Sequence, residues 1–281
     1  HAVLHLLYAR FWTKAMRDMG LLHFDEPFLK LMNHGMVLNH IFFTPNAKGG
    51  KDYYPPQDVK TTHDAQGHIT GGTIADGSAV QYGGIGKMGK SERNGVDPQE
   101  LIDKYGADTA RLYVMFMGGP EDASVWSDGA VEGAQRFLKR VWAFGAQHAA
   151  RIRSAGALDS TGLSAADKDV RFAVHVALKQ ASADYERMQY NTVVSAAMKM
   201  LNALEEAKSS DALLREGAHL LLRVLYPVAP HVSCVLWQDL GFHRDFGNLM
   251  DTAFPQADEA ALARDQIELA LQVNGKLRGT I

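Results

Sequence analysis

Cysteine is almost absent from this sequence, because Cys234 is the only one among 281 residues. A single thiol excludes a disulfide framework and any zinc site built from cysteines, and its apolar helical context predicts a buried structural thiol. No apolar run is long enough to cross a bilayer and no signal peptide is evident, so we expect a cytoplasmic protein without a membrane partner. An excess of positive charge is also missing, since the formal net charge is −3 at pH 7. Any nucleic-acid contact must therefore come from local basic patches.

The hydrophobic content of 46% is sufficient for a buried core, and the length allows one large or two modest domains. The chain starts inside a helical pattern at His1 and stops inside an apparent strand. This predicts a piece of a longer protein.

The chain is organised around a glycine-rich segment, residues 83–91, which contains Lys87 and Lys90 and ends at Ser91. Glycine lets the backbone approach a ligand closely, and lysine brings a mobile positive charge. The segment therefore predicts a polyphosphate site. A plain glycine-rich turn with solvated lysines is the structural alternative.

The same segment also matches the phosphate-binding pattern G-x-x-x-x-G-K-[ST] through Gly84 and residues 89–91. That motif needs a buried strand before it and a helix that begins at the Gly-Lys-Ser. Residues 76–82 are instead a short polar alternation typical of an edge hairpin strand, and Asn94-Gly95 marks a turn. The flanks therefore disfavour a P-loop.

The periodicity of the remaining chain predicts its elements. We expect helices over 1–19 and 26–32, a buried parallel strand over 35–38, and short hairpins from about 43 to 82. Asp97 is expected to cap a helix that Gly106 ends, and Asp108 to cap the next helix. From Ser127 to about Asp239 the apolar spacing predicts four or five helices in a bundle, with Met198, Met200 and Trp237 as core residues. An alternation around Asn274-Gly275 predicts a final hairpin.

Lys87-Met88-Gly89-Lys90-Ser91 resembles the K-M-S-K-S signature of class I aminoacyl-tRNA synthetases. Residues 94–98 and 105–111 are similar to the continuation of that signature. The departure is Gly89, where the family usually has serine; this change removes a hydroxyl and loosens the loop.

Other segments narrow the resemblance to the leucyl-tRNA synthetase family, in the bacterial type. They cover nearly the whole chain in order: residues 1–11, 35–38, 136–142, 226–231 and 270–279. Residues 87–91 are called the lysine loop below. The β-rich stretch over 43–82, just before this loop, occupies the same place in the sequence as a small insertion of that family. The family's H-I-G-H signature and its large editing insertion have no counterpart here.

The resemblance implies an α/β plus all-α fold: the C-terminal part of a Rossmann-type catalytic fold with a small β-rich insertion, followed by a helical bundle. The implied divisions are 1–42 (end of the nucleotide-binding fold), 43–82 (insertion), 83–126 (lysine loop and supporting helices), 127–265 (anticodon-binding-type bundle) and 266–281 (start of a truncated C-terminal domain).

The implied reaction is activation of leucine by ATP to leucyl-adenylate, followed by transfer to tRNA(Leu). Lys90 and Lys87 are the implied catalytic residues; Met88, Gly89 and Ser91 bind ATP with them, and His1 and Met36 lie near the adenylate. Mg²⁺ is expected with ATP, the full-length enzyme is expected to be monomeric, and the fragment alone is expected to be inactive.

Arg136, Lys139 and Arg140 lie at helical spacing and form a basic face. In a tRNA-dependent enzyme this face would contact tRNA phosphates; the alternative is an ordinary solvated helix face. His40, His63 and His68 fit no metal-ligand spacing, so we expect no metal site within the chain. Two alternatives remain open: a valyl, isoleucyl or methionyl relative, and a non-catalytic RNA-binding helical module.

Overall fold

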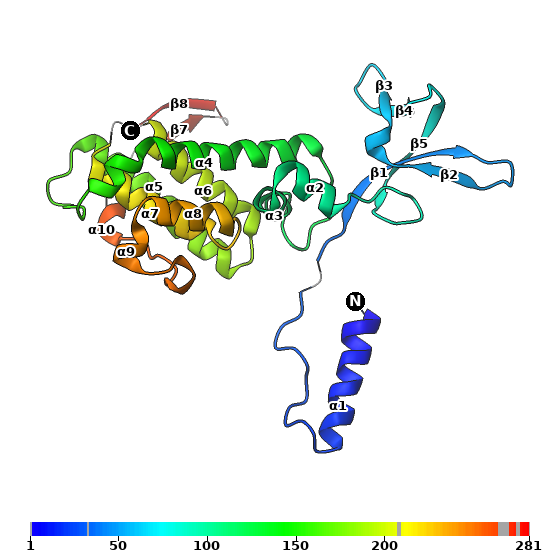
Figure 1. The fold of residues 1–281 in the computed structure, drawn as a ribbon, viewed down its shortest axis with the longest axis horizontal. Helices are drawn as coiled ribbons and strands as arrows, with labels where there is room; N and C mark the ends of the chain where they lie inside the picture. Colours follow the sequence, from blue (N-terminus) through cyan, green and yellow to red (C-terminus); the bar gives the residue numbers. More distant parts are fainter. Residues whose placement is uncertain (1, 33, 207–208, 264–269, 274–275, 281) are drawn as a thin grey trace. The chain divides into compact units, whose positions relative to one another are not determined.

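The computed structural model describes residues 2–32, 34–206, 209–263, 270–273 and 276–280, with side chains described up to residue 263 (Figure 1). The chain divides into two compact units. The sheet unit comprises His1–Val96 and Gly118–Trp126, and the helical unit comprises Asp97–Met117 and Ser127–Ile281. No helix in the described part of the chain is both long and apolar enough to span a membrane.

The N-terminal segment is helical, as predicted, although its first half has π-helical hydrogen bonding. Element η1 covers Ala2–Ala9 and α1 covers Arg10–Asp18, and Gly20 ends the helix with φ +77°. The helix expected over 26–32 is wrong, because described residues 21–32 contain no helix or strand. Short helices are marginal without a packed face, and Phe28 and Leu29 are exposed here.

The sheet unit is built on a 6-stranded sheet in the order β2-β1-β5-β4-β3, with β6 paired to β1. Neighbouring strands on that path are antiparallel, and the β1–β6 pair is parallel. The expected parallel pairing thus occurs at Val37 and Leu38, although both are only half-buried. The strands are β1 (Val37–Pro45), β2 (Lys51–Tyr54), β3 (Lys60–His63), β4 (Ile69–Thr73), β5 (Ala79–Lys87) and β6 (Ser124–Val125), with a 3₁₀ turn η2 (Pro56–Asp58).

Strand β5 differs from its prediction in position and in length. It lies between β1 and β4 rather than at an edge, and it continues through the glycines to Lys87. The glycines make room for the neighbouring strand, since a Cβ on Gly86 would lie 2.7 Å from Ile41 Cδ1. Gly84 adopts φ +88°, a value that favours glycine, next to the register shift in the β1–β5 pair. Much of the expected loop is therefore strand.

The helical unit begins with two short helices, α2 (Pro98–Tyr105) and α3 (Ala107–Phe116). The Asp97 side chain accepts the Gln99 amide, and Gly106 ends α2 at φ +87°, as predicted. Asp108 does not cap its own helix. Its carboxylate accepts the backbone amides of His231 at 3.3 Å and Val232 at 2.7 Å, at the start of a helix more than a hundred residues later. The first backbone amides of a helix have no partner within that helix, and the tertiary structure determines which of them an aspartate can bind.

The predicted bundle is present. Figure 1 shows α4 running along the unit, where it packs on α6, α7 and α8. Its elements are α4 (Asp128–Ser154), α5 (Ala165–Glu186), α6 (Tyr190–Glu206), α7 (Asp211–Leu225), α8 (Pro230–Asp239), α9 (Phe242–Phe246), η3 (Leu249–Asp251) and α10 (Glu259–Leu262). The final antiparallel pair, β7 (Ala270–Val273) and β8 (Lys276–Thr280), confirms the expected strands, while their turn at 274–275 lies outside the described residues.

The core of the bundle follows the predicted stripes. Met200, Leu201, Leu221 and Trp237 are almost completely buried. One predicted core position differs, because Met198 is only half-buried. Cys234 is half-buried rather than buried, and partial burial raises the pKa of its thiol.

Candidate nucleotide-binding loop

The lysine loop begins where β5 ends. Lys87 is the last residue of the strand, paired with Leu38 of β1, and the Met88 amide donates to the Val37 carbonyl at 3.3 Å. Residues 90–93 form a turn, and no helix begins before Pro98. A P-loop is therefore wrong for this segment, because the Gly-Lys-Ser leads into a turn rather than into a helix N-terminus.

The positive charges of the loop face solvent. The side chains of Lys87 and Lys90 are exposed, as is that of Ser91. Met88 and Gly89, between the lysines, are half-buried. The arrangement presents two mobile cations and a hydroxyl on one short loop, which suits a flexible, highly charged ligand such as a polyphosphate.

Two buried asparagines hold the base of the loop. Asn94 is fully buried, and its side-chain oxygen accepts the Gly89 amide at 2.8 Å. Its Nδ2 donates to the carbonyls of Lys87 at 3.3 Å and Asn39 at 3.4 Å. Asn39 is 4% exposed and returns a bond from Nδ2 to the Asn94 carbonyl at 3.0 Å. Its own oxygen accepts the His40 amide.

Sequence reasoning missed this pair. The sequence places Asn94 in an Asn-Gly turn and in the continuation of the family signature, without predicting a contact for its side chain, and Asn39 lies in an ordinary strand pattern 55 positions away. The available signal is weak: Asn39 is an amide-bearing residue in β1 with apolar residues, Val37 and Ile41, two positions away on either side.

The space at Gly89 is occupied by a carboxylate. A Cβ on Gly89 would lie 2.3 Å from Glu92 Oε2, and the same oxygen accepts the Ser91 hydroxyl at 2.8 Å. In this chain, the absence of a side chain at position 89 is thus matched by an acidic side chain that folds back over it. Arg93 completes the turn at φ +50°, an uncommon conformation for a residue other than glycine.

Met36, another expected nucleotide contact, directly precedes the residues of β1 that pair with the start of the loop. It immediately precedes β1, is 50% exposed, and its carbonyl accepts the Ser124 amide. The strand beside it carries the partners of Lys87 and Met88. His1 lies outside the described residues.

The expected basic face is on α4 of the helical unit. Arg136, Lys139 and Arg140 are all exposed. Arg140 donates to Asn202 at 2.7 Å and forms an ion pair with Glu205, whereas Lys139 donates to Gln135 of the same helix at 3.2 Å. Among the described residues, Arg140 is thus the cation of this face that a carboxylate of another helix engages.

Among the described residues, no group of three or more His, Cys, Asp or Glu side chains is arranged to hold a metal ion. His68 bonds to Asp64 in a turn, at 3.1 Å. His40 on β1 bonds to the Tyr82 hydroxyl at 2.9 Å, and burial lowers the pKa of His40 while raising that of Tyr82. His40 is therefore part of the packing of the sheet unit, whereas His68 is exposed in its turn.

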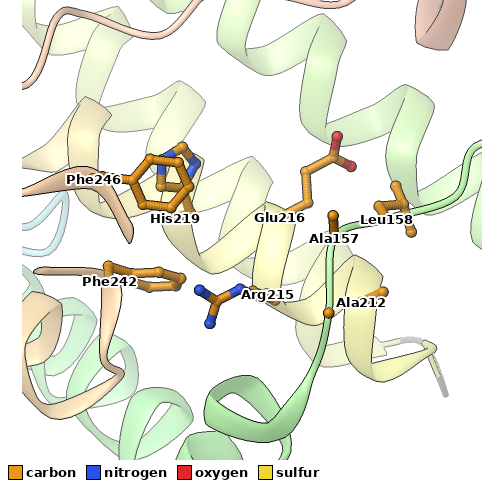
Figure 2. A pocket seen from close by; sticks show the side chains of 9 residues that line it. Ala157, Leu158, Ala212, Arg215, Glu216, His219, Phe242 and Phe246 are labelled. Atoms are coloured by element: carbon orange, nitrogen blue, oxygen red, sulfur yellow. The ribbon is translucent and has the colours of Figure 1, made fainter. Parts of the chain in front are cut away.

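The helical unit contains a pocket of about 230 Å³ between α7, α9 and residues 156–158 (Figure 2). In Figure 2 the rings of His219, Phe242 and Phe246 form one end, and the guanidinium of Arg215 points toward Phe242. Arg215 lies 5.1 Å from the Phe242 ring centroid, donates to the Ile152 carbonyl and pairs with Asp245.

The remaining polar groups of this pocket are also engaged. Glu216 accepts hydrogen bonds from Nε and Nη2 of the buried Arg171, at 2.9 Å each. Burial raises the pKa of Glu216, but hydrogen bonds from His175 and Arg171 outweigh it and leave that pKa below its ordinary value. Burial lowers the pKa of His219 to about 4, so its ring is uncharged at neutral pH. The charged side chains that line the pocket are thus paired with oppositely charged groups, and His219 is neutral. The lysine loop therefore remains the candidate site.

Known proteins resemble this chain in its helical unit and along its whole length. Residues 167–281 match the family described as anticodon-binding domain of tRNA ligase. The whole chain is 58% identical to a leucine–tRNA ligase of Variovorax paradoxus (strain S110) and 57% identical to that of Ralstonia nicotianae (strain GMI1000), covering 32% of each relative. The chain thus spans about a third of the length of these curated relatives.

A solved structure is similar over the full chain as well. It is an Agrobacterium radiobacter K84 agnB2 LeuRS, in a ternary complex with tRNA and LeuAMS. Identity is 29%, the TM-score is 0.72, and the match covers 100% of this chain and 30% of that one. The resemblance seen in the sequence is confirmed: this chain is similar along its whole length to a part of these leucine–tRNA ligases.

Proposed function

We propose that this chain is the part of a leucine–tRNA ligase that closes a lysine loop over ATP and carries the helical tRNA-binding domain. The observation that carries the proposal is the pair of exposed lysines, Lys87 and Lys90, on a loop whose base is fixed by buried hydrogen bonds. The similarity to leucine–tRNA ligases along the whole chain supports leucine as the amino acid, rather than valine, isoleucine or methionine.

In the reaction, the leucine carboxylate attacks the α-phosphorus of ATP, pyrophosphate leaves, and the leucyl group passes from the adenylate to the terminal adenosine of tRNA(Leu). Negative charge develops on the phosphate oxygens during the first step. Preorganised positive charge stabilises such a transition state. Lys90 and Lys87 supply that charge, and Met88, Gly89 and Ser91 line the same loop beside the nucleotide.

The rest of the nucleotide site comes from beyond the loop. On this proposal Met36, immediately before β1, lies beside the adenine. The Rossmann-type part of the catalytic fold is completed by the portion of the enzyme that this chain does not cover, since the relatives are about three times as long. The chain by itself is therefore expected to form no adenylate.

Mg²⁺ enters with the ATP phosphates, because magnesium is commonly held by substrate phosphates with few protein carboxylates. It supplies neutralisation of phosphate charge when bound. On the helical unit, Arg136 and Lys139 contact tRNA phosphates, whereas Arg140 forms an ion pair with Glu205. We place the enzyme in the cytoplasm as a monomer.

The test uses the full-length enzyme that contains this segment. Replacing Lys90 with alanine is expected to lower leucine-dependent ATP–pyrophosphate exchange about 100-fold or more, the loss typical of one charge-stabilising donor. Lys48→Ala is the matched control, since Lys48 is an exposed lysine in the β1–β2 turn and should leave the rate unchanged.

An unchanged rate for Lys90→Ala would refute the proposed role of the loop. The non-catalytic alternative would then be the better account, and it makes its own prediction. Binding of tRNA would depend on salt but be indifferent to ATP and to Lys90.

A further inference from the structure

The loop that carries the two lysines is attached to the sheet by reciprocal hydrogen bonds between two buried asparagine side chains and the backbone. Asn94 contacts both ends of the lysine-containing turn, because it bonds to Lys87 and Gly89 on one side and belongs to the chain leaving the turn on the other. Asn39 fixes Asn94 in turn to the middle of β1.

The amide of Asn94 is almost fully used in these contacts. Its oxygen accepts one N–H, and its nitrogen lies within reach of two carbonyls. A buried amide satisfied in this way has one orientation, since rotation would place like groups against each other. The turn is therefore closed at a defined point, while Lys90 and Ser91 at its tip stay exposed.

We infer that Asn94, with Asn39 as its support, is a positioning residue for amino-acid activation: it sets where Lys87 and Lys90 stand relative to the nucleotide. The inference rests on the proposed ATP function of the loop. Asn94 itself does not touch the ligand, because it is fully buried. It acts through the carbonyl of Lys87 and the amide of Gly89, which flank Met88.

Two neighbouring features fit this role. Arg93 adopts φ +50° immediately before Asn94, so the chain reverses sharply at the fixed point. Lys87 is the last residue of β5 and is therefore held by the sheet. Lys90 lies in the turn beyond the residues that Asn94 binds. A change at Asn94 should displace Lys90 more than Lys87.

The test replaces Asn94 by aspartate in the full-length enzyme. Asn94→Asp keeps the shape and the oxygen that accepts the Gly89 amide, but it loses the donors to Lys87 and Asn39 and places oxygen against two carbonyls. Adenylate formation measured in a single turnover at saturating ATP is expected to fall about 10- to 100-fold, since a small misplacement of a reacting group costs that much. Asn46→Asp, in the β1–β2 turn, is the control for an asparagine that also organises a turn.

A second readout separates positioning from a general structural role. Transfer of leucine from preformed leucyl-adenylate to tRNA takes place after pyrophosphate has left, so it should stay within about twofold of wild type. Hydrogen exchange at the Gly89 amide should accelerate, because this amide donates to Asn94. Asn39→Asp should act in the same direction, and the double variant should be less than additive.

Equal losses in activation and transfer, or an activation rate within twofold of wild type, would overturn the inference. Lys90→Ala distinguishes the two proposals. If Lys90→Ala slows activation and Asn94→Asp does not, only the positioning role fails. If Lys90→Ala has no effect, the ATP role of the loop fails, whatever Asn94→Asp does.

Discussion

The two units of this chain hold their important side chains by different physical means. The helical unit buries a continuous apolar core that includes Met200, Leu221 and Trp237. In the sheet unit, the described buried apolar cluster is small, comprising Phe42, Val59 and Val80. Its loop is instead held by the polar pair Asn39 and Asn94.

This difference predicts two kinds of mutational effect. Apolar burial contributes in proportion to the area removed from water, so losses in the helical unit should appear as lower stability. Hydrogen bonds that fix a loop contribute modestly to stability but determine the position of exposed groups. Losses at the loop should therefore appear first as slower activation.

The largest stability effect is expected from the bundle core. Leu221→Ala removes a side chain that is 1% exposed and leaves a cavity. It should lower the free energy of unfolding by about 2–5 kcal/mol. Urea unfolding followed by far-UV circular dichroism measures this change.

Val235→Ala is the matched control, because Val235 is 45% exposed in the same unit. It should change the free energy of unfolding by at most about 0.5 kcal/mol. A Leu221→Ala variant as stable as the control would show that the bundle core is not the stabilising element described above.

A pH-dependent effect of intermediate size is expected at His219. Burial is the main cause of its pKa of about 4, with further lowering by Arg223 and Arg215 and an opposing effect of Glu216. The unfolded chain binds a proton at this histidine near pH 6.5 and the folded chain does not, so stability is complete above that pH and is lost as pH falls toward 4. The loss attributable to His219 is at most about 3 kcal/mol.

His219→Gln removes the titrating group and serves as the test. The stability difference between pH 7 and pH 4.5 should be smaller in this variant than in the wild-type chain. Burial also lowers the pKa of His148, so some pH dependence in the same direction should remain. An identical pH dependence in both proteins would contradict the assigned burial of His219.

The contrast between the units also explains what the sequence could predict. Helices of the bundle carry their own signals: apolar spacing along each helix, and serine side chains that accept an amide of the first turn at Ser127, Ser164 and Ser210. These features are local, and the apolar spacing among them predicts the helices of the bundle. The failure over 26–32 has a matching cause, because the apolar side chains of Phe28 and Leu29 are exposed and supply no packed face for a short helix.

The loop depends on contacts between distant positions, and local patterns do not report these. The motif identified Lys87 and Lys90, yet not the strand that extends to Lys87, which depends on the fit of Gly86 against Ile41. Asp108 shows the same limit. Its type and its place at a helix start predicted a cap, but the amides that it satisfies belong to α8.

The smallest expected effect concerns the residue at which this loop departs from the family signature. Gly89→Ser restores the usual hydroxyl, but its Cβ would lie 2.3 Å from Glu92 Oε2, so the carboxylate must move. Because Glu92 is a flexible side chain and the Ser91 hydroxyl is its bonded partner, we expect activation to change by no more than about fivefold, near 1 kcal/mol. Combining Gly89→Ser with Glu92→Ala should remove most of that change, and a double-mutant cycle on the pyrophosphate-exchange rate measures the coupling. A loss as large as that expected for Lys90→Ala, unrelieved by Glu92→Ala, would mean that Gly89 is required by the backbone of the loop itself, and that Glu92 is not the residue that compensates for the missing serine.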